Sequence, residues 1–325
     1  MPSLGEWRVP PEIEPNPENY DYDLGNALDS VVAVKANVPE DAFTADILGT
    51  ERSGNGVVIG DDGVILTIGY LITEAETVWL TTNDDRVMQG HALGYDHETG
   101  FGLIQALGRL DLPALDLGRA RDLKIGSRVV TAGAGGSEHS VAAVVAAKQE
   151  FAGYWEYVLD EAIFTVPAHP YWGGTALIGP KGTLAGIGSL QLQQAREDGS
   201  SAPLNMFVPI DLLPPIYNDL MTIGRPNRPA RPWLGLYATD SDDGIVVAGV
   251  AGRGPAAHAN IRMGDVVLSV GGSRIDGLAG FFRAIWSTGK AGVEVPMKLF
   301  RDGRVVDVNV KSGDRHTFMK GPSLH

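Results

Sequence analysis

The chain has 325 residues, of which 44% are hydrophobic and 20% are charged, and its formal net charge is −14. At roughly 100–200 residues per domain, this length predicts two globular domains. The acidity argues against nucleic acid and against an anionic membrane as partners, because both require clustered Lys and Arg. The chain has no cysteine, which excludes disulfides, thiolate nucleophiles and Cys-based zinc sites and leaves the redox compartment open.

The first 24 residues are rich in proline and glutamate and predict an extended tail, because proline fixes φ and removes a backbone donor. This tail has no apolar segment of the secretory type, so we expect a cytoplasmic protein. Trp7, Tyr20 and Tyr22 are its sizeable apolar groups, and we expect them to dock on the body of the protein or on a neighbouring subunit. The aliphatic run Val141–Ala147 is far shorter than the about 20 residues that cross a bilayer.

Short β-type runs separated by Gly, Asp-Gly and Pro follow from about residue 27 to residue 216. Six strands are predicted at 31–38, 56–59, 64–68, 77–82, 87–95 and 101–107. Six more are predicted at 128–134, 140–148, 162–166, 175–178, 183–192 and 205–209. Asp62-Gly63 and Lys181-Gly182 are typical of hairpin turns. Two groups of about six strands predict a mainly β fold of two packed antiparallel barrels. A short helix broken by Pro214 and Pro215 is expected to close this part of the chain.

The proline-spaced basic segment Arg225–Pro232 predicts a linker between two domains. Strands are predicted after it at 244–250, 266–270, 293–300 and 305–310, with a helix at 278–287. The predicted domain limits are a tail at 1–24, a double barrel at 25–224, the linker at 225–232, a small α+β module at 233–314 and a second tail at 315–325.

The order of these elements and seven segments within them resemble the HtrA/Deg family of trypsin-like serine proteases, in which a PDZ domain follows the barrels. The resemblance covers about residues 27–313. The matching barrel segments are Asp29–Val32, Gly54–Ile59, Asp62–Ile72, Asp96–Ile104, Pro170–Leu177, Lys181–Ile187 and Met206–Pro209. The resemblance implies a trypsin-like double β-barrel followed by a small α+β PDZ domain.

The residues that carry proteolysis in this family do not match. Acyl transfer of this kind needs a hydroxyl nucleophile, an imidazole base and an orienting carboxylate. The resemblance places these three groups at Trp172, Tyr70 and Gly100. A tyrosine with an ordinary pKa near 10 keeps its proton at neutral pH, glycine has no carboxylate and tryptophan has no nucleophile.

The oxyanion hole of the family is also altered. The resemblance places one of its N–H donors at Pro170, which has no N–H, and loss of one such donor costs about 10²–10³ in rate. Together these departures predict a chain that is not an enzyme: a pseudoprotease that acts as a protein-binding scaffold, adaptor or regulatory subunit.

The second module resembles an HtrA-type PDZ domain. Its segment Pro232–Leu236 resembles the loop that binds a peptide carboxylate through consecutive N–H groups, and Gly254–Val270 resembles the PDZ pattern in which Gly264-Asp265 turns into a strand. We expect the peptide between strand 244–250 and helix 278–287. The expected peptide-binding residues are Trp233, Leu234, Gly235, Leu236, Phe282 and Ile285. The helical spacing of the last two, and of Trp286, fits core residues equally well, so the loop is the stronger candidate.

Other functions stay open. The chain could be an active serine endopeptidase of the same family with an unrecognised or relocated site, although the hydroxyls of Ser53 and Ser189 have no identifiable base beside them. A metal-binding pseudoprotease would use His97 and His169, but no short-spaced pair of ligands is present, so neither a metal nor another cofactor is expected. Tyr70, Tyr171 and Trp172 either fill the cleft or present a flat apolar surface to a partner.

The partner that we expect is a protein or a peptide C-terminus. The resemblance also implies assembly, either as a homotrimer through barrel contacts near the N-terminal segment or as a hetero-complex with an enzyme.

Overall fold

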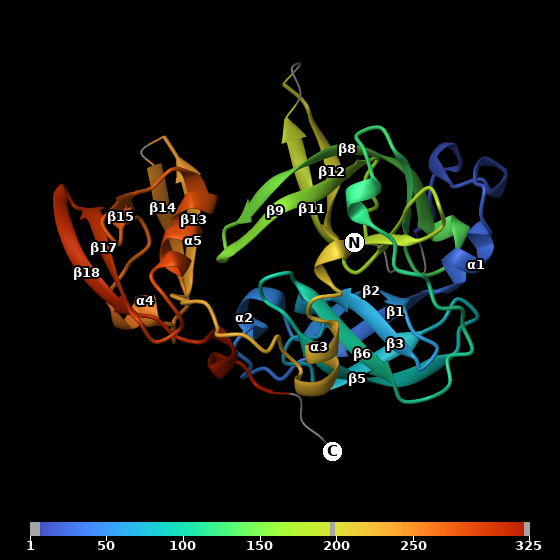
Figure 1. Cartoon of the computed structure of the whole chain (residues 1–325), viewed down its shortest axis with the longest axis horizontal. Coiled ribbons are helices and arrows are strands. Elements are labelled where there is room, and N and C mark those ends of the chain that lie inside the picture. The colour runs from blue at the N-terminus through green and yellow to red at the C-terminus, as the bar shows by residue number, and fades with distance from the viewer. Residues whose placement is uncertain (1–6, 196–198, 243, 322–325) are drawn as a thin grey trace. The chain divides into compact units, whose positions relative to one another are not determined.

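Two closed antiparallel barrels of six strands form the larger part of the protein in the computed structural model (Figure 1). The structure describes residues 7–195, 199–242 and 244–321. The predicted tails at 1–24 and 315–325 therefore lie partly outside the described residues. In the first barrel the strand order is β1 (Val31–Asn37), β2 (Glu51–Val58), β3 (Val64–Ile68), β6 (Phe101–Ala106), β5 (Val87–Tyr95) and β4 (Thr77–Thr81).

The second barrel has the same number of strands. Its order is β10 (Ala176–Ile178), β11 (Leu184–Ala195), β12 (Ser201–Pro209), β9 (Tyr157–Val166), β8 (Ser140–Gly153) and β7 (Arg128–Ala132). Short helices precede, join and follow the strands of the barrels: η1 (Pro11–Ile13), η2 (Pro17–Asn19) and α1 (Leu24–Asp29) before β1; α2 (Ala45–Leu48), η3 (Gly69–Leu71), η4 (Ala120–Asp122) and η5 (Ser137–His139) between strands; and η6 (Ile210–Leu212) and α3 (Tyr217–Ile223) after β12. The predicted mainly β architecture of two barrels is confirmed, because each group of six strands forms a closed barrel.

Strands β8 and β9 are longer than predicted. They form a hairpin that continues to Gly153 and restarts at Tyr157, whereas the sequence indicates strands only at 140–148 and 162–166. The extra residues carry exposed acidic side chains on both strands, at Glu150 and Asp160, so the apolar alternation that marks a strand is lost there.

The chain divides into two compact units. The first comprises residues 1–149, 161–227 and 321–325, and the second comprises residues 150–160 and 228–320. Residues 150–160 are the end of β8, the turn and the start of β9, and we call them the hairpin tip. The predicted domain limits assign these residues to the barrels, whereas in the structure they pack with the C-terminal elements.

The second unit contains a five-stranded antiparallel path in the order β13 (Leu236–Ser241), β14 (Gly244–Val250), β15 (Val266–Val270), β17 (Glu294–Arg301) and β18 (Arg304–Lys311), with β16 (Ser273–Arg274) paired to β15. Its helices are α4 (Pro255–His258), α5 (Gly277–Ser287) and η7 (Arg315–Phe318). Strand β13 is absent from the predicted elements, because its first residue belongs to the segment expected to form a loop.

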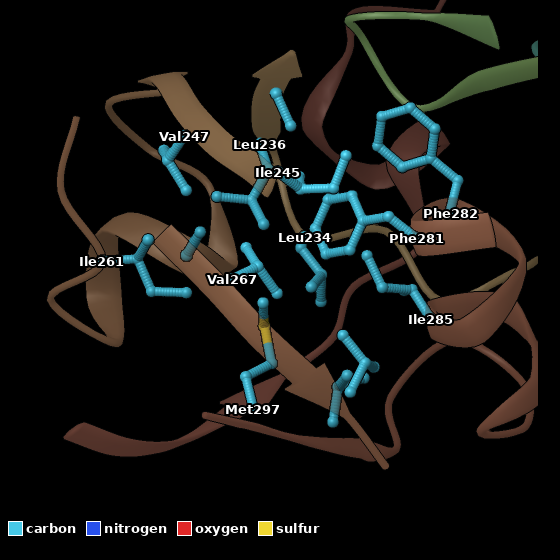
Figure 2. Packing of buried hydrophobic residues seen from close by; sticks show 14 of the residues in the cluster. Leu234, Leu236, Ile245, Val247, Ile261, Val267, Phe281, Phe282, Ile285 and Met297 are labelled. Carbon is cyan, nitrogen blue, oxygen red and sulfur yellow. The ribbon is translucent and has the colours of Figure 1, made fainter. Parts of the chain in front are cut away.

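Buried apolar side chains from the sheet and from α5 form the core of this unit, as Figure 2 shows for Leu234, Ile245 and Phe281. Phe282 and Ile285, predicted to bind peptide, are fully buried members of the same cluster. Val158 of the hairpin tip belongs to it too. The core of the second unit is therefore completed by a residue from the middle of the chain.

A bidentate ion pair fixes the start of β15. The carboxylate of Asp265 accepts hydrogen bonds from Arg301 Nε at 2.6 Å and Nη2 at 2.5 Å, and from the N–H of Arg262 at 2.8 Å. Asp265 is buried, so its acceptor capacity is met inside the protein. The predicted turn at Gly264-Asp265 is present.

Phe281→Ala is expected to destabilise the second unit by about 3–5 kcal/mol, because removing a fully buried phenyl ring leaves a cavity. Phe300, on β17 and 41% exposed, provides the matched control, and Phe300→Ala is expected to change stability by only about 0.5 kcal/mol. Native-state hydrogen exchange of residues 244–310, followed by mass spectrometry, measures both changes. Equal losses in the two variants would contradict this description of the core.

Candidate functional site

Tyr70, Gly100 and Trp172 lie close together in the first unit. Tyr70 is on η3, directly after β3, and the N–H of its neighbour Gly69 donates to the carbonyl of Gly100 at 2.6 Å. The Tyr70 hydroxyl donates to the carbonyl of Ser189 on β11 at 2.9 Å. A Cβ placed on Gly173 would come within 2.7 Å of the same hydroxyl. The three segments that the resemblance matches to the protease triad thus meet where the first barrel faces the second.

Asn55 holds the loop that carries Trp172. Its side-chain Nδ2 donates to the carbonyls of Tyr171 and Gly173, both at 3.0 Å, and its backbone N–H donates to Gly173 at 2.8 Å. Its Oδ1 accepts the N–H of Ala134 at 2.9 Å. Asn55 is fully buried on β2, so one amide ties the first barrel to two loops of the second.

A buried arginine fixes η3 from the other side. Arg52 donates through Nη1 to the carbonyls of Tyr70 and Thr73, both at 2.8 Å, and Glu74 accepts the backbone N–H groups of Phe43 and Thr44 at 2.9 and 2.7 Å. The two bonds from Arg52 fix the backbone of η3, which carries the Tyr70 side chain.

The residues at positions 70, 100 and 172 offer few groups that can exchange a proton at neutral pH. Burial raises the pKa of Tyr70 above its usual value, so its hydroxyl stays protonated at neutral pH and is a hydrogen-bond donor. Gly100 has a φ of +86°, and its N–H donates to the carbonyl of Asp96 at 2.8 Å. The Asp96 carboxylate accepts the N–H groups of Glu98 and Thr99 at 3.2 and 3.1 Å, so it serves the turn. Pro170 carries no N–H.

His169 is a structural residue. Its Nδ1 accepts the N–H of Tyr171 at 3.0 Å, so its Nε2 carries the proton and donates to the carbonyl of His139 at 2.9 Å. Burial lowers the pKa of His169 to about 4, so the ring is neutral at pH 7 with both nitrogens engaged. Among the described residues, no group of three or more His, Asp or Glu is placed to hold a metal ion, and His97 lies edge-on to Tyr95, with ring centroids 4.6 Å apart.

The N-terminal tail packs beside this region. The ring of Trp7 lies 4.9 Å from that of His169 and 5.9 Å from that of Tyr171, both edge-on, and the N–H of Val9 donates to the carbonyl of Glu138 at 2.8 Å. The expected docking of tail aromatics on the body is confirmed for Trp7.

The helices among the described residues are all too short or too polar to cross a membrane.

The predicted carboxylate-binding loop binds a carboxylate of the protein itself. The N–H groups of Leu234, Gly235 and Leu236 donate to Glu156 Oε1 at 3.2, 2.7 and 3.0 Å. Gly235 has a φ of +73°, and this left-handed conformation lets consecutive N–H groups point to one side. Glu156, in the turn of the hairpin tip, is only 6% exposed. Trp233 supports the loop, since its backbone pairs with Gly313 and its ring packs 4.8 Å from that of Phe318.

Burial raises the pKa of Glu156 to about 7, against the opposing effect of the three N–H donors and of Arg315. This residue is not among the predicted site residues, because a single glutamate in the segment Gly153–Tyr157 matches no motif and the side of the hairpin that it occupies is set by the fold. What marks Glu156 is visible only in the structure: it lies at a turn position with φ +60°, where glycine or asparagine is favoured.

The edge of the sheet beside this loop also differs from the prediction. The peptide was expected next to 244–250, but β14 is hydrogen-bonded to β13 on one side and to β15 on the other. Strand β13 is the edge of the sheet and lies against α5. An added strand needs unpaired backbone groups, so a peptide would pair with β13 and not with β14. There the N–H of Ala238 donates to the carbonyl of Tyr154 in the hairpin tip at 2.9 Å.

Comparison with known proteins agrees with these two parts. The family model for the trypsin-like peptidase domain matches residues 54–187, and the one for the PDZ domain matches residues 232–312. Curated relatives include probable periplasmic serine endoproteases, DegP-like, from Pseudomonas fluorescens (28% identity, covering 80% of this chain and 56% of the relative) and Halomonas elongata (27% identity, 82% and 58%). This chain thus spans a little over half the length of these relatives.

Solved structures share the fold. The HtrA-type protease AlgW with a decapeptide is 20% identical with a TM-score of 0.53, covering 93% of this chain and 100% of the other. The serine endoprotease from Yersinia pestis is 22% identical with a TM-score of 0.53, covering 90% and 98%.

The comparisons correct two expectations. The expectation that the chain is not an enzyme is wrong, because its curated relatives are named serine endoproteases; it rested on the four positions at which this sequence departs from the family's pattern. The expectation of a cytoplasmic location is also wrong, because the same relatives are named periplasmic. The first 24 residues were a poor guide, since the composition of a tail does not report the compartment of a folded domain.

Asn55→Ala is expected to lower the free energy of unfolding by about 2–3 kcal/mol, because the Tyr171 carbonyl and the Ala134 N–H lose a buried partner. Urea denaturation followed by circular dichroism measures the loss. Asn218→Ala, at an exposed position of α3 in the same unit, serves as the control and should stay within about 0.5 kcal/mol of the wild type. A loss no larger than that of the control would show that Asn55 does not hold the loop.

The stability of the second unit is expected to fall as the pH rises from 4.5 to about 7. The folded-state pKa of Glu156 is raised from 4.5 to about 7, so the stabilisation from its bound proton is complete below 4.5 and is lost through 7, by about 3 kcal/mol in total. The charged or titratable groups that interact with Glu156 are Arg315 and Tyr237; an arginine stays charged throughout this window, and burial raises the pKa of Tyr237 above its usual value, so it stays protonated.

Hydrogen exchange of the second unit in the wild type and in Glu156→Gln, measured between pH 4.5 and 8, isolates this contribution. The difference between the two proteins should change across the window, with the variant gaining relative stability at high pH. Parallel profiles would contradict the assignment.

Proposed function

We propose that this chain, whose two parts match the family models for a trypsin-like peptidase domain and a PDZ domain and which is similar to HtrA/DegP proteins, binds polypeptides by their carboxyl termini. The observation that supports this most directly is the convergence of the Leu234, Gly235 and Leu236 N–H groups on one carboxylate oxygen. A chain-end carboxylate presents the same two oxygens as a glutamate side chain.

The elements around the loop suit an extended ligand. Strand β13 is the edge of its sheet and lies against α5, so a peptide would add to it as an antiparallel strand, with affinity from main-chain hydrogen bonds and selectivity from side-chain contacts. Leu236, Phe282 and Ile285 are apolar residues of this region, but all three are buried in the core, so the loop N–H groups would carry most of the recognition. Trp233 supports the loop.

The cellular location and the role of this binding are inferred from the relatives. We infer a periplasmic location from the names of the DegP-like proteins. The ligand would be the exposed end of another polypeptide, and binding of such an end would serve recruitment of a protein partner or regulation of it. Assembly as a homotrimer or as a hetero-complex is retained as a prediction.

Serine endopeptidase activity is a second candidate, favoured by the names of the same relatives. Tyr70, Gly100 and Trp172 do not offer a nucleophile, base and carboxylate at the family's positions, so this activity would use a hydroxyl elsewhere with its own base. Labelling with a fluorophosphonate probe, identification of the modified residue by mass spectrometry and probe-sensitive hydrolysis of unfolded casein would support it. An unlabelled protein that leaves casein intact would remove this candidate.

Peptide recognition is tested with fluorescein-labelled octapeptides that end in Ala, Val, Leu or Phe, each made with a free and with an amidated C-terminus. Fluorescence anisotropy should show at least about tenfold tighter binding of one or more free-carboxylate peptides than of their amidated copies, because amidation removes the charge that the three N–H groups face.

Gly235→Ala should weaken this binding at least about tenfold, because its φ is +73° and its Cβ would lie 3.1 Å from the Trp233 ring. Gly252→Ala, in the turn after β14, introduces a Cβ into open space, and this variant should bind the peptide like the wild type. Equal affinities for free and amidated peptides would refute carboxyl-terminal recognition.

A further inference from the structure

We propose that the hairpin tip is an internal ligand of the PDZ domain: Glu156 occupies the place of a chain-end carboxylate, and an external peptide binds by displacing it. The inference rests on the proposed function and adds to it how access to the site is controlled. It commits to one occupant, residues 150–160 of this chain, which are already seated on the loop and on the edge strand.

The tip reproduces the two kinds of contact that a bound peptide would make. Glu156 accepts the three loop N–H groups, and two residues earlier the carbonyl of Tyr154 accepts the N–H of Ala238 at 2.9 Å. Leu236 and Ala238 are two residues apart on β13, so their N–H groups point to the same edge of the sheet. The chain direction from Tyr154 to Glu156 runs toward the loop. A carboxylate at the loop and a main-chain bond two residues before it are what an added antiparallel strand would provide.

The backbone of Glu156 supports a role for its side chain. Its φ of +60° lies in the left-handed region, which glycine and asparagine occupy at lower cost. A glutamate occupies this position although the hairpin turn itself would close more easily with glycine. The side chain is what glycine lacks, and in this structure it binds the loop.

Besides the burial of Val158 in the core, the tip is attached by exposed ion pairs. Arg283 on α5 pairs with Glu150 at 2.5 Å and with Asp160 at 2.5 Å, one residue from each strand of the hairpin. All three side chains are largely exposed, between 44% and 92%, so these pairs contribute little to stability in water. The aromatic side chains of the turn stack on one another, with Trp155 and Tyr157 5.5 Å apart and nearly parallel.

Burial of Glu156 adds a cost that favours release. A carboxylate removed from water is stable only when its hydrogen bonds and nearby charges replace hydration, and here it depends on three N–H groups and on Arg315. A peptide terminus would make the same bonds and would add its own apolar side chains. The same loop can therefore exchange one carboxylate for the other.

The test uses the full chain with Glu156→Gly, which removes the carboxylate and relieves the left-handed φ, so the hairpin is expected to fold. Glu161→Ala is the matched control, because Glu161 lies on the same hairpin and pairs with Lys148 at 2.9 Å. With the free-carboxylate octapeptide that binds best, Glu156→Gly should bind at least about tenfold tighter than the wild type, and Glu161→Ala should match the wild type.

Arg283→Ala provides a second variant that leaves Glu156 and the loop unchanged. Loss of its pairs with Glu150 and Asp160 should loosen the tip and tighten peptide binding about threefold. In the wild type, saturating peptide should speed hydrogen exchange of residues 150–160 while it protects residues 234–238. A tip that served only as a structural support would show neither effect.

The outcomes separate the two proposals. Equal peptide affinity in the wild type, Glu156→Gly and Arg283→Ala, with no change in exchange at the tip, would overturn the internal ligand and leave carboxyl-terminal recognition standing. Failure of every variant, Glu156→Gly included, to distinguish free from amidated peptides would overturn both.

Discussion

The contact between the Glu156 carboxylate and three consecutive N–H groups of the 234–236 loop organises the second unit. It joins residues 78–80 positions apart in the chain, and it brings with it Val158, which completes the core, and Tyr154, which pairs with the edge strand. The loop is therefore not an empty turn that awaits a ligand. A site built to bind a carboxylate is present, and the protein supplies a carboxylate to it.

In the first unit, buried hydrogen bonds keep the two barrels in one arrangement where their loops meet. Asn55 contributes to this with buried hydrogen bonds from β2 to backbone carbonyls in a loop of the second barrel, while Arg52 fixes η3 within the first barrel. Because an unpaired buried carbonyl is costly, these two side chains restrict the loops more than apolar contacts of similar size would. Tyr70 and Trp172 are held in this frame, and the Tyr70 hydroxyl is itself used as a donor to Ser189.

Similarity to known proteins and side-chain chemistry carry different information here. The relatives are named serine endoproteases, and the barrels have the same fold as solved HtrA-type proteases. The residues at the positions of the family's triad offer a protonated phenol, a glycine and an indole. Peptide binding depends on backbone N–H groups and on a strand edge, which these side chains do not affect, and for that reason it is the function that the geometry supports best.

The sequence by itself determined the two barrels, the second module and most of their strands, because alternating apolar residues between Gly and Pro turns are a local pattern with a local physical cause. The 232–236 loop was placed by its resemblance to the carboxylate-binding loop of HtrA-type PDZ domains, and the structure adds that Gly235 has a left-handed φ. Only the tertiary structure decided that β13 is the edge strand, that Phe282 and Ile285 are buried in the core and that Glu156 fills the loop. Those facts depend on which distant segments meet, and strand order and hairpin docking are set by the packing of the whole chain, for which a single glutamate in a turn provides no local signal.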